Sequence, residues 1–218
     1  MARGDACFAE IALKTKIGVM KGGKIMQKVF VLTLIFGLLL PLTAAADECI
    51  EGDCINGQGT LAFDTGNKYT GGFKDGVRQG DGILLLPGGR KIVGVWENNE
   101  MKSGTYTEPD GTVYKGQWKF RERNGQGTLS YPDGRKYVGE FKSGQRHGQG
   151  TMDFPDGRQY EGEFFQGQRT GRGAMTYSDG RKYIGEFKDG NRNGQGTMIY
   201  PSGKKREGRF KDGDFVGN

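Results

Sequence analysis

The chain has 218 residues, of which 41 are glycine, six are proline and 24 are aromatic (13 Phe, nine Tyr and two Trp). Because the aromatic residues recur in register with the glycines, this composition excludes a collagen-like chain and a disordered linker. The net charge is +6, but residues 1–46 hold six basic and two acidic residues, and the remaining 26 basic and 24 acidic residues are too balanced for a general nucleic-acid binder.

The first 46 residues resemble a leader. Residues 1–25 carry no helix or strand pattern, and the true start is expected at Met20 or Met26. Residues 26–46 have the three parts of a signal peptide: a basic start, a short apolar run over 29–40, and small residues ending at Ala46. We expect export to a periplasm or the exterior after cleavage near Ala46. The alternative is a membrane anchor formed by residues 29–45, although the apolar run is short for a span.

Two cysteines would remain after such cleavage, Cys49 and Cys54. Close cysteines in an exported chain are most simply a disulfide, and two free thiols are the alternative. The bond would cap the array at residues 47–53. No metal site is expected, because two cysteines and the distant His147 cannot complete four ligands. No cofactor is expected either.

Nearly everything after residue 54 repeats with a period of 23 residues. The segment Tyr137-Val138-Gly139-Glu140-Phe141 has copies at 69–73, 92–96, 114–118, 160–164, 183–187 and 206–210. One residue is missing between Ile92 and Tyr114. We therefore expect an array of about seven units over residues 54–218.

Each unit predicts two β-strands. In residues 137–141 the alternation places Tyr137, Gly139 and Phe141 on one face. Residues 148–154 alternate in the same way, and Pro155-Asp156-Gly157 supplies a turn. Glycines such as Gly139, Gly148 and Gly150 would leave room for aromatic rings to lie over the backbone.

These residues resemble the MORN repeat, whose pattern runs Tyr-x-Gly-x-Phe/Trp, Gly, Gly-x-Gly and a closing Gly. The resemblance covers about three quarters of the chain. It implies an all-β fold, an elongated single-layer antiparallel sheet of tandem β-hairpins. We expect seven strands of each type, with the last at 206–210 followed by a loop over 211–218. Two departures, Asn98-Asn99 with the deletion and Arg121 in place of a loop glycine, predict local bending or loosening.

The first candidate binding surface is an aromatic face. A single-layer sheet lacks a second layer, so its rings pack on one another and on the glycines, or are offered to a partner. Further rings would come from Tyr131, Phe154, Tyr177 and Tyr200 on the second strands. The candidate residues are Tyr69, Phe73, Tyr114, Trp118, Tyr137, Phe141, Tyr160, Phe164, Tyr183 and Phe187.

The second candidate is a basic ladder of residues 23 apart, Arg123, Arg146, Arg169 and Arg192. A second basic line follows the turns at Arg135, Arg158, Arg181 and Lys204. Regular basic rungs suit an anionic polymer or lipid surface, and the MORN resemblance implies phospholipid or membrane attachment. The alternative is charge pairing on a solvated face, with Asp133, Asp156 and Asp179 two residues before the second line.

An enzyme is not expected. The single His147 lies in a loop where other copies have Gln, Asn or Thr, and the carboxylates recur by repeat instead of converging. We predict a non-enzymatic interaction or scaffold protein that binds a protein partner or a second copy through the aromatic face or an end strand. The alternative is a module for anionic phospholipid surfaces or glycans.

Overall fold

The computed structural model describes residues 46–218. They form sixteen strands and one short 3-10 helix, η1 (Pro87–Gly89). The expectations for residues 1–25 and, apart from Ala46, for the signal peptide lie outside the described residues. The strands are β1 (Glu48–Gly52), β2 (Gln58–Ala62), β3 (Lys68–Lys74), β4 (Val77–Leu85), β5 (Lys91–Glu97), β6 (Glu100–Thr107), β7 (Val113–Lys119), β8 (Glu122–Ser130), β9 (Lys136–Lys142), β10 (Gln145–Asp153), β11 (Gln159–Phe165), β12 (Gln168–Thr176), β13 (Lys182–Lys188), β14 (Asn191–Ile199), β15 (Lys205–Lys211) and β16 (Asp214–Gly217).

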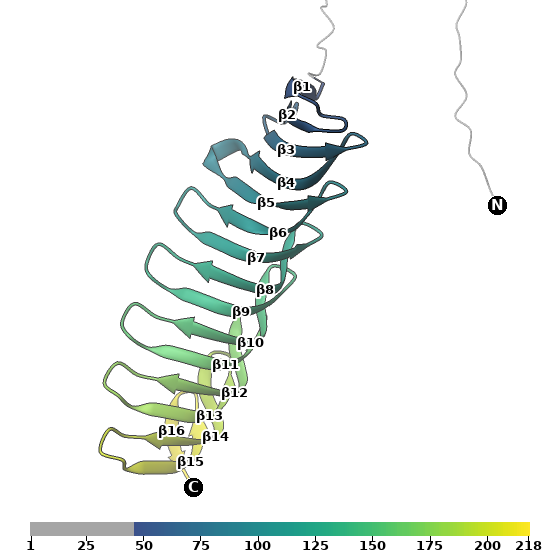
Figure 1. The fold of residues 1–218 in the computed structure, drawn as a ribbon. Helices are drawn as coiled ribbons and strands as arrows, with labels where there is room; N and C mark the ends of the chain where they lie inside the picture. The colour runs from purple at the N-terminus through teal and green to yellow at the C-terminus, as the bar shows by residue number, and fades with distance from the viewer. Residues whose placement is uncertain (1–45) are drawn as a thin grey trace, which may run out of the picture. The chain divides into compact units, whose positions relative to one another are not determined.

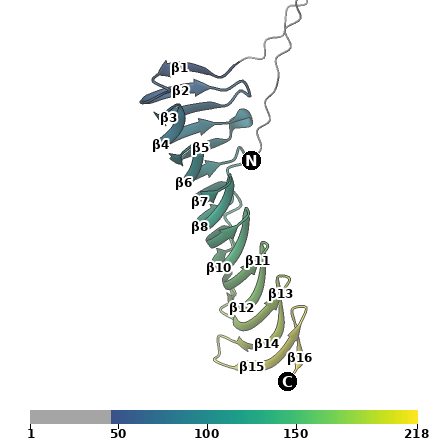
Figure 2. The ribbon, with the colours of Figure 1, turned by 90° about the vertical axis from the view of Figure 1, so that its right-hand side faces the viewer.

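All sixteen strands belong to one sheet, in which each strand pairs with its neighbours in the sequence. Figure 1 shows the hairpins stacked in chain order from β1 to β16, and Figure 2 shows the sheet twisting along this stack. The predicted single-layer antiparallel array is therefore confirmed. Within residues 46–218, no helix is long and apolar enough to cross a membrane.

A single row of glycines crosses the sheet from β2 to β15. Residues directly opposite each other on antiparallel strands point to the same face, so this row leaves one face without side chains along its length. The row runs through Gly59, Gly71, Gly82, Gly94, Gly104, Gly116, Gly127, Gly139, Gly150, Gly162, Gly173, Gly185, Gly196 and Gly208.

Tyrosine rings cover this bare row. A Cβ added to Gly150 would lie 2.4 Å from Tyr137 Oη, and one added to Gly139 would lie 2.6 Å from the same atom. The Tyr137 hydroxyl donates to the Glu140 carbonyl oxygen at 2.9 Å, and its side chain is fully buried. The expectation that Gly139 and Gly150 make room for a ring is confirmed.

Gly148 has a different reason to be glycine, which corrects the expectation for that position. The register shifts between His147 and Gly150, so Gly148 does not belong to the glycine row. Its φ is +56°, and an added Cβ would lie 2.6 Å from the Glu140 carboxylate. That carboxylate accepts a hydrogen bond from the Gln149 backbone N–H at 3.0 Å.

From Tyr114 onward, the rings of successive hairpins form a continuous aromatic ladder. The Tyr137 ring meets Phe141 of its own strand at 5.2 Å between centroids and Phe164 of the next hairpin at 4.9 Å, both edge to face. Such pairs contribute about 0.5–1.5 kcal/mol each beyond the area that they bury. The same alternation continues from Tyr114 to Phe215. The core is therefore a line of rings along the sheet.

The two ends of the array differ from expectation in one respect. Cys49 in β1 forms the predicted disulfide with Cys54, which lies between β1 and β2. At the other end, the segment expected to be a loop over 211–218 contains β16, which pairs with β15. The seven strands of the first type are confirmed, whereas the second type has eight members, from β2 to β16. Phe215 extends the pattern because it packs on Phe210 at 5.3 Å.

The contact between Tyr137 and Gly150 predicts that Gly150→Ala destabilises the array. Because the added methyl would overlap the buried ring, we expect a loss of about 3 kcal/mol, at the upper end of overpacking costs. Gly144→Asn is the matched control, since an added Cβ there meets nothing within 4 Å and Asn99 holds φ +67° in the corresponding turn. Urea unfolding should separate the two variants, and equal losses would contradict the role of the ring.

The buried tyrosines predict sensitivity to alkali. Burial raises the pKa of Tyr114, Tyr137, Tyr160 and Tyr183 to about 12. Because the unfolded side chains lose their protons near pH 10, stability should be constant below that pH and fall between pH 10 and 12. The loss is at most about 1.4 kcal/mol per tyrosine per pH unit. Denaturant unfolding at pH 9, 10 and 11 measures this slope, and Tyr160→Phe should make it shallower; an unchanged slope would contradict the assignment.

Candidate functional site

The structure places the predicted aromatic face in the core. Nine of its ten residues are buried, with at most 6% of each exposed, and only Trp118 is half-buried. Of the two alternatives that the sequence left open, packing of the rings on one another holds for those nine, because rings from neighbouring hairpins cover one another, and the expectation that they form an exposed binding face is corrected. Tyr131, Phe154, Tyr177 and Tyr200 are partly buried beside them.

The predicted basic ladder also lies between hairpins instead of projecting into solvent. Arg146 donates from a guanidinium nitrogen to the Gly167 carbonyl oxygen at 2.7 Å, and Arg169 donates to that of Gly190 at 2.5 Å. Arg192 makes the same bond to Gly213. The guanidinium carbon of Arg169 lies 5.6 Å from the centre of the Tyr160 ring.

These contacts correct both expectations for the ladder. Arg123, Arg146, Arg169 and Arg192 are all half-buried over core rings, and the bonds described for the last three run to backbone carbonyls instead of acidic side chains. Burial lowers the pKa of Arg169. We therefore interpret the ladder as an inter-hairpin brace.

The three arginines of the second basic line are charge-paired within their turns, whereas the turn before Lys204 has Ser202 in place of the aspartate. In each pair the arginine Nε lies 2.7 Å from the aspartate Oδ2. The pairs are Arg135 with Asp133, Arg158 with Asp156 and Arg181 with Asp179. A backbone N–H bond from Arg135 is the main cause that lowers the pKa of Asp133. The expected pairing of these charges is confirmed, although within a turn and not across strands.

His147 lies in a strand, which corrects the expectation of a loop position. It is half-buried in β10, with its ring 5.4 Å from the ring of Phe165. Within residues 46–218, no three His, Cys, Asp or Glu side chains gather in a way that could hold a metal ion.

Both ladders are interrupted in the hairpin of β5 and β6. Ile92 occupies the place of the tyrosine, as its register with Leu84 and Tyr106 shows. The glycines that would seat the ring, Gly94 and Gly104, are still present, but the nearest atoms to their added Cβ positions are backbone only. The two opposed glycines thus leave the space for a tyrosine ring, but no tyrosine occupies it.

The brace is missing at the same place. Met101 pairs with Trp96 in the register where Arg146 pairs with Phe141. In other hairpins a turn N–H donates to the carbonyl of this residue one hairpin earlier, as Gly167 does to Arg146 at 2.9 Å. Among residues 46–218, no such bond joins Arg121 to Met101. The turn at Phe120-Arg121, with φ of +51° and +63°, therefore lacks its upstream anchor.

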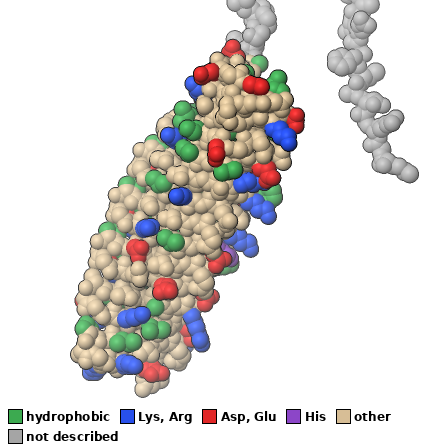
Figure 3. Space-filling view, viewed as in Figure 1, with side chains coloured by type: hydrophobic (Ala, Val, Ile, Leu, Met, Phe, Trp, Pro, Cys, Tyr) green, Lys and Arg blue, Asp and Glu red, His purple; other side chains and the backbone are tan. Residues whose placement is uncertain are grey.

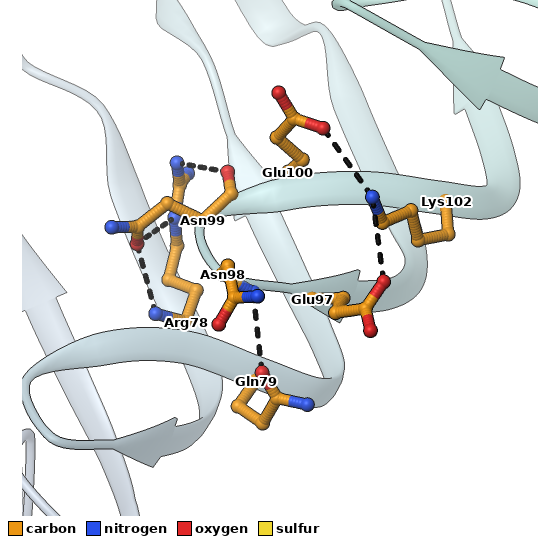
Figure 4. Close-up of polar contacts among 7 residues, drawn as sticks. All are labelled: Arg78, Gln79, Glu97, Asn98, Asn99, Glu100 and Lys102. Atoms are coloured by element: carbon orange, nitrogen blue, oxygen red, sulfur yellow. Dashed lines mark hydrogen bonds and ion pairs between the residues drawn. The ribbon is translucent and has the colours of Figure 1, made fainter.

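The upstream side of this hairpin is braced normally (Figure 4). Arg78 donates to the Asn99 carbonyl oxygen at 2.8 Å, and its backbone N–H donates to the Asn99 side chain at 2.9 Å. The Asn98 N–H donates to Gln79 at 3.2 Å, and Lys102 lies 3.4 Å from both Glu97 and Glu100. The missing backbone anchor and the missing arginine therefore both lie at the step from β6 to the next hairpin.

A groove of about 680 Å³ opens at this step. The buried core divides here into two clusters, and half-buried Trp118 packs against both. The walls of the groove include Leu84, Ile92, Trp96, Met101, Tyr106 and Trp118. The sequence predicted loosening at these copies but not a groove. The groove arises because Ile92 stands in the position of a tyrosine and Met101 in the position of an arginine, and the absence of a residue type is not a motif.

Two indole nitrogens at the groove lack an acceptor. In residues 46–218, the buried side-chain nitrogen and oxygen atoms without a hydrogen-bond partner are Nε1 of Trp96 and Nε1 of Trp118. Buried N–H groups are nearly always paired in native proteins. The guanidinium of Arg78 lies over the Trp96 ring, 4.4 Å from its centre. The groove therefore combines aromatic walls with two unused donors.

Comparison with known proteins agrees with the repeat. The MORN repeat family matches residues 69–89, 114–134, 137–157, 160–180 and 183–205. No curated protein matches. One similar solved structure is the SAS-4 (dCPAP) TCP domain of Drosophila melanogaster in complex with a proline-rich motif of Ana2 (dSTIL). Its sequence is 18% identical and its TM-score is 0.48, and the match covers 79% of this chain and 97% of that chain. The G-box domain of the microcephaly protein CPAP is 13% identical with a TM-score of 0.43, covering 76% and 100%.

These structural likenesses are too low to carry an argument about binding. The family is shown by the five matched segments, which coincide with the hairpins described above. The chain therefore belongs to the MORN repeat family.

Proposed function

We propose that this chain is a non-enzymatic interaction module that binds a segment of a partner protein in the groove between Trp96 and Trp118. The observation that carries the proposal is the interruption of both ladders at Ile92 and Met101. Elsewhere the rings are closed by the next hairpin, whereas here apolar side chains line an open groove and two unpaired indole donors lie buried beside it. Concave aromatic sites with few polar groups are typical of binding sites.

A partner protein fits this site better than a second copy of the chain. Self-association was expected through the aromatic face or an end strand, and the first of these routes needs uncovered rings, whereas nine of the ten are buried. The remaining apolar opening is local and concave, which suits an inserted segment.

The anionic-surface alternative has less support. The ladder arginines are engaged with backbone carbonyls and rings, and the turn arginines are paired with aspartates. Figure 3 shows basic and acidic side chains interspersed on the visible face, without a field of one sign. Membrane attachment through these residues would require their present contacts to break.

We further propose that the chain is exported. The apolar run and small residues before Ala46 motivate this, and the disulfide of Cys49 and Cys54 supports it because such bonds persist in oxidising compartments. Peptide mapping of the mature N-terminus tests it, with Asp47 expected as the first residue.

The binding site is tested by repairing the ladders. Ile92→Tyr with Met101→Arg restores the residues that the other hairpins have, so the double variant should fill the groove and remain folded, with an equal or higher melting temperature. Peptides selected from an unbiased phage-displayed library on the full chain should change the fluorescence of Trp96 and Trp118, the two tryptophans of the protein. They should bind the repaired variant at least tenfold more weakly.

Val138→Thr is the matched control, because Val138 is exposed in β9, away from the groove. It should bind the selected peptides like the wild type. Selected peptides that bind the repaired variant with undiminished affinity would refute the groove as the site.

A further inference from the structure

We infer that the groove takes a proline-rich segment in the polyproline II conformation. This inference rests on the proposed function and specifies its ligand. It follows from the donors at the groove, its apolar walls, the pairing of the surrounding strands and the charges at its rim.

The donors call for carbonyl acceptors. Both unpaired groups, Nε1 of Trp96 and Nε1 of Trp118, are indole N–H groups, which donate and cannot accept. Both are closed off from solvent in the unliganded groove, so a ligand carbonyl would reach them with a rotation of the rings. A peptide carbonyl oxygen has two lone pairs and is the common acceptor in such a segment.

The apolar walls favour a ligand that brings few donors. Leu84, Ile92, Met101 and Leu129 line the groove and offer no side-chain acceptor. An ordinary peptide would bury backbone N–H groups against these walls, and a sugar would bury hydroxyl donors, each at a cost. Proline has a carbonyl but no N–H, so its backbone enters without an unpaired donor.

The strands around the groove exclude the addition of a peptide strand. Each strand from β4 to β8 is already paired on both sides, so no free edge is available there. Aromatic-lined grooves instead accept the preformed polyproline II helix, whose rings pack between aromatic side chains. Trp96, Tyr106, Tyr114 and Trp118 supply such rings.

The rim charges favour an uncharged segment. Three arginines, Arg78, Arg121 and Arg123, face four carboxylates, Asp47, Asp64, Glu108 and Glu122, around the groove. Arg78 is already bonded to Asn99. This near balance offers little preference for a ligand of either sign.

The test uses the full chain labelled with ¹⁵N and a blocked octaproline peptide. The two indole N–H signals report on the groove directly, because the protein has two tryptophans. Titration should shift both signals downfield with saturation, as expected when each N–H gains an acceptor. Octa-D-proline has the same composition and the opposite helical hand, so it should bind at least tenfold more weakly. Maltohexaose tests the glycan alternative and should leave both signals in place.

Trp96→Phe and Trp118→Phe remove one donor each. Phenylalanine occupies the corresponding position in Phe73, Phe141, Phe164, Phe187 and Phe210, so both variants should fold. Each should weaken octaproline binding at least tenfold, whereas Val138→Thr should not.

The outcomes separate this inference from the proposed function. Octaproline that leaves the indole signals unmoved, while library-selected peptides without proline bind the groove, would overturn the inference and leave the proposed function standing. Indole signals that shift with maltohexaose and not with octaproline would overturn the inference and indicate a glycan as the ligand. Selected peptides whose binding is unchanged in the repaired variant would contradict both proposals.

Discussion

The contact on which this fold depends is a tyrosine ring lying on two opposed glycines. The Tyr137 ring can lie over Gly139 and Gly150 only because neither carries a Cβ. The ring then meets Phe141 and Phe164 edge to face and joins its hairpin to the next. Because Tyr69, Tyr114, Tyr160 and Tyr183 repeat this contact in their own hairpins, a single-layer sheet obtains a buried core without a second layer.

Much of this could be predicted from the sequence. The period of 23 residues, the alternation around Gly139 and the turn residues after Phe154 depend on local chemistry, and they predicted the repeated strands and their order, from β2 to β15, but not β1 or β16. The disulfide of Cys49 and Cys54 followed from their proximity. These features need no knowledge of how distant side chains meet.

Other features could not be predicted because they depend on the next hairpin. Burial of the rings requires Phe164 to cover Tyr137, and the alternation within one unit does not contain that contact. Arg146 resembles an exposed basic rung in the sequence, yet its acceptor is the carbonyl of Gly167, which any residue would supply. The groove follows from a missing ring at Ile92 and a missing brace at Met101, so no positive motif marks it. In this account the regular hairpins close the core, and the irregular one provides the site.

Hydrogen–deuterium exchange along the full chain tests most directly whether the array is interrupted at Ile92 and Met101. Backbone amides exchange through local opening, which is easier where packing and bracing contacts are missing. We expect faster exchange in β6 and β7 than in β9 to β14. Equal protection of β6, β7 and the regular hairpins would contradict the claim that the groove lies at a break in both ladders.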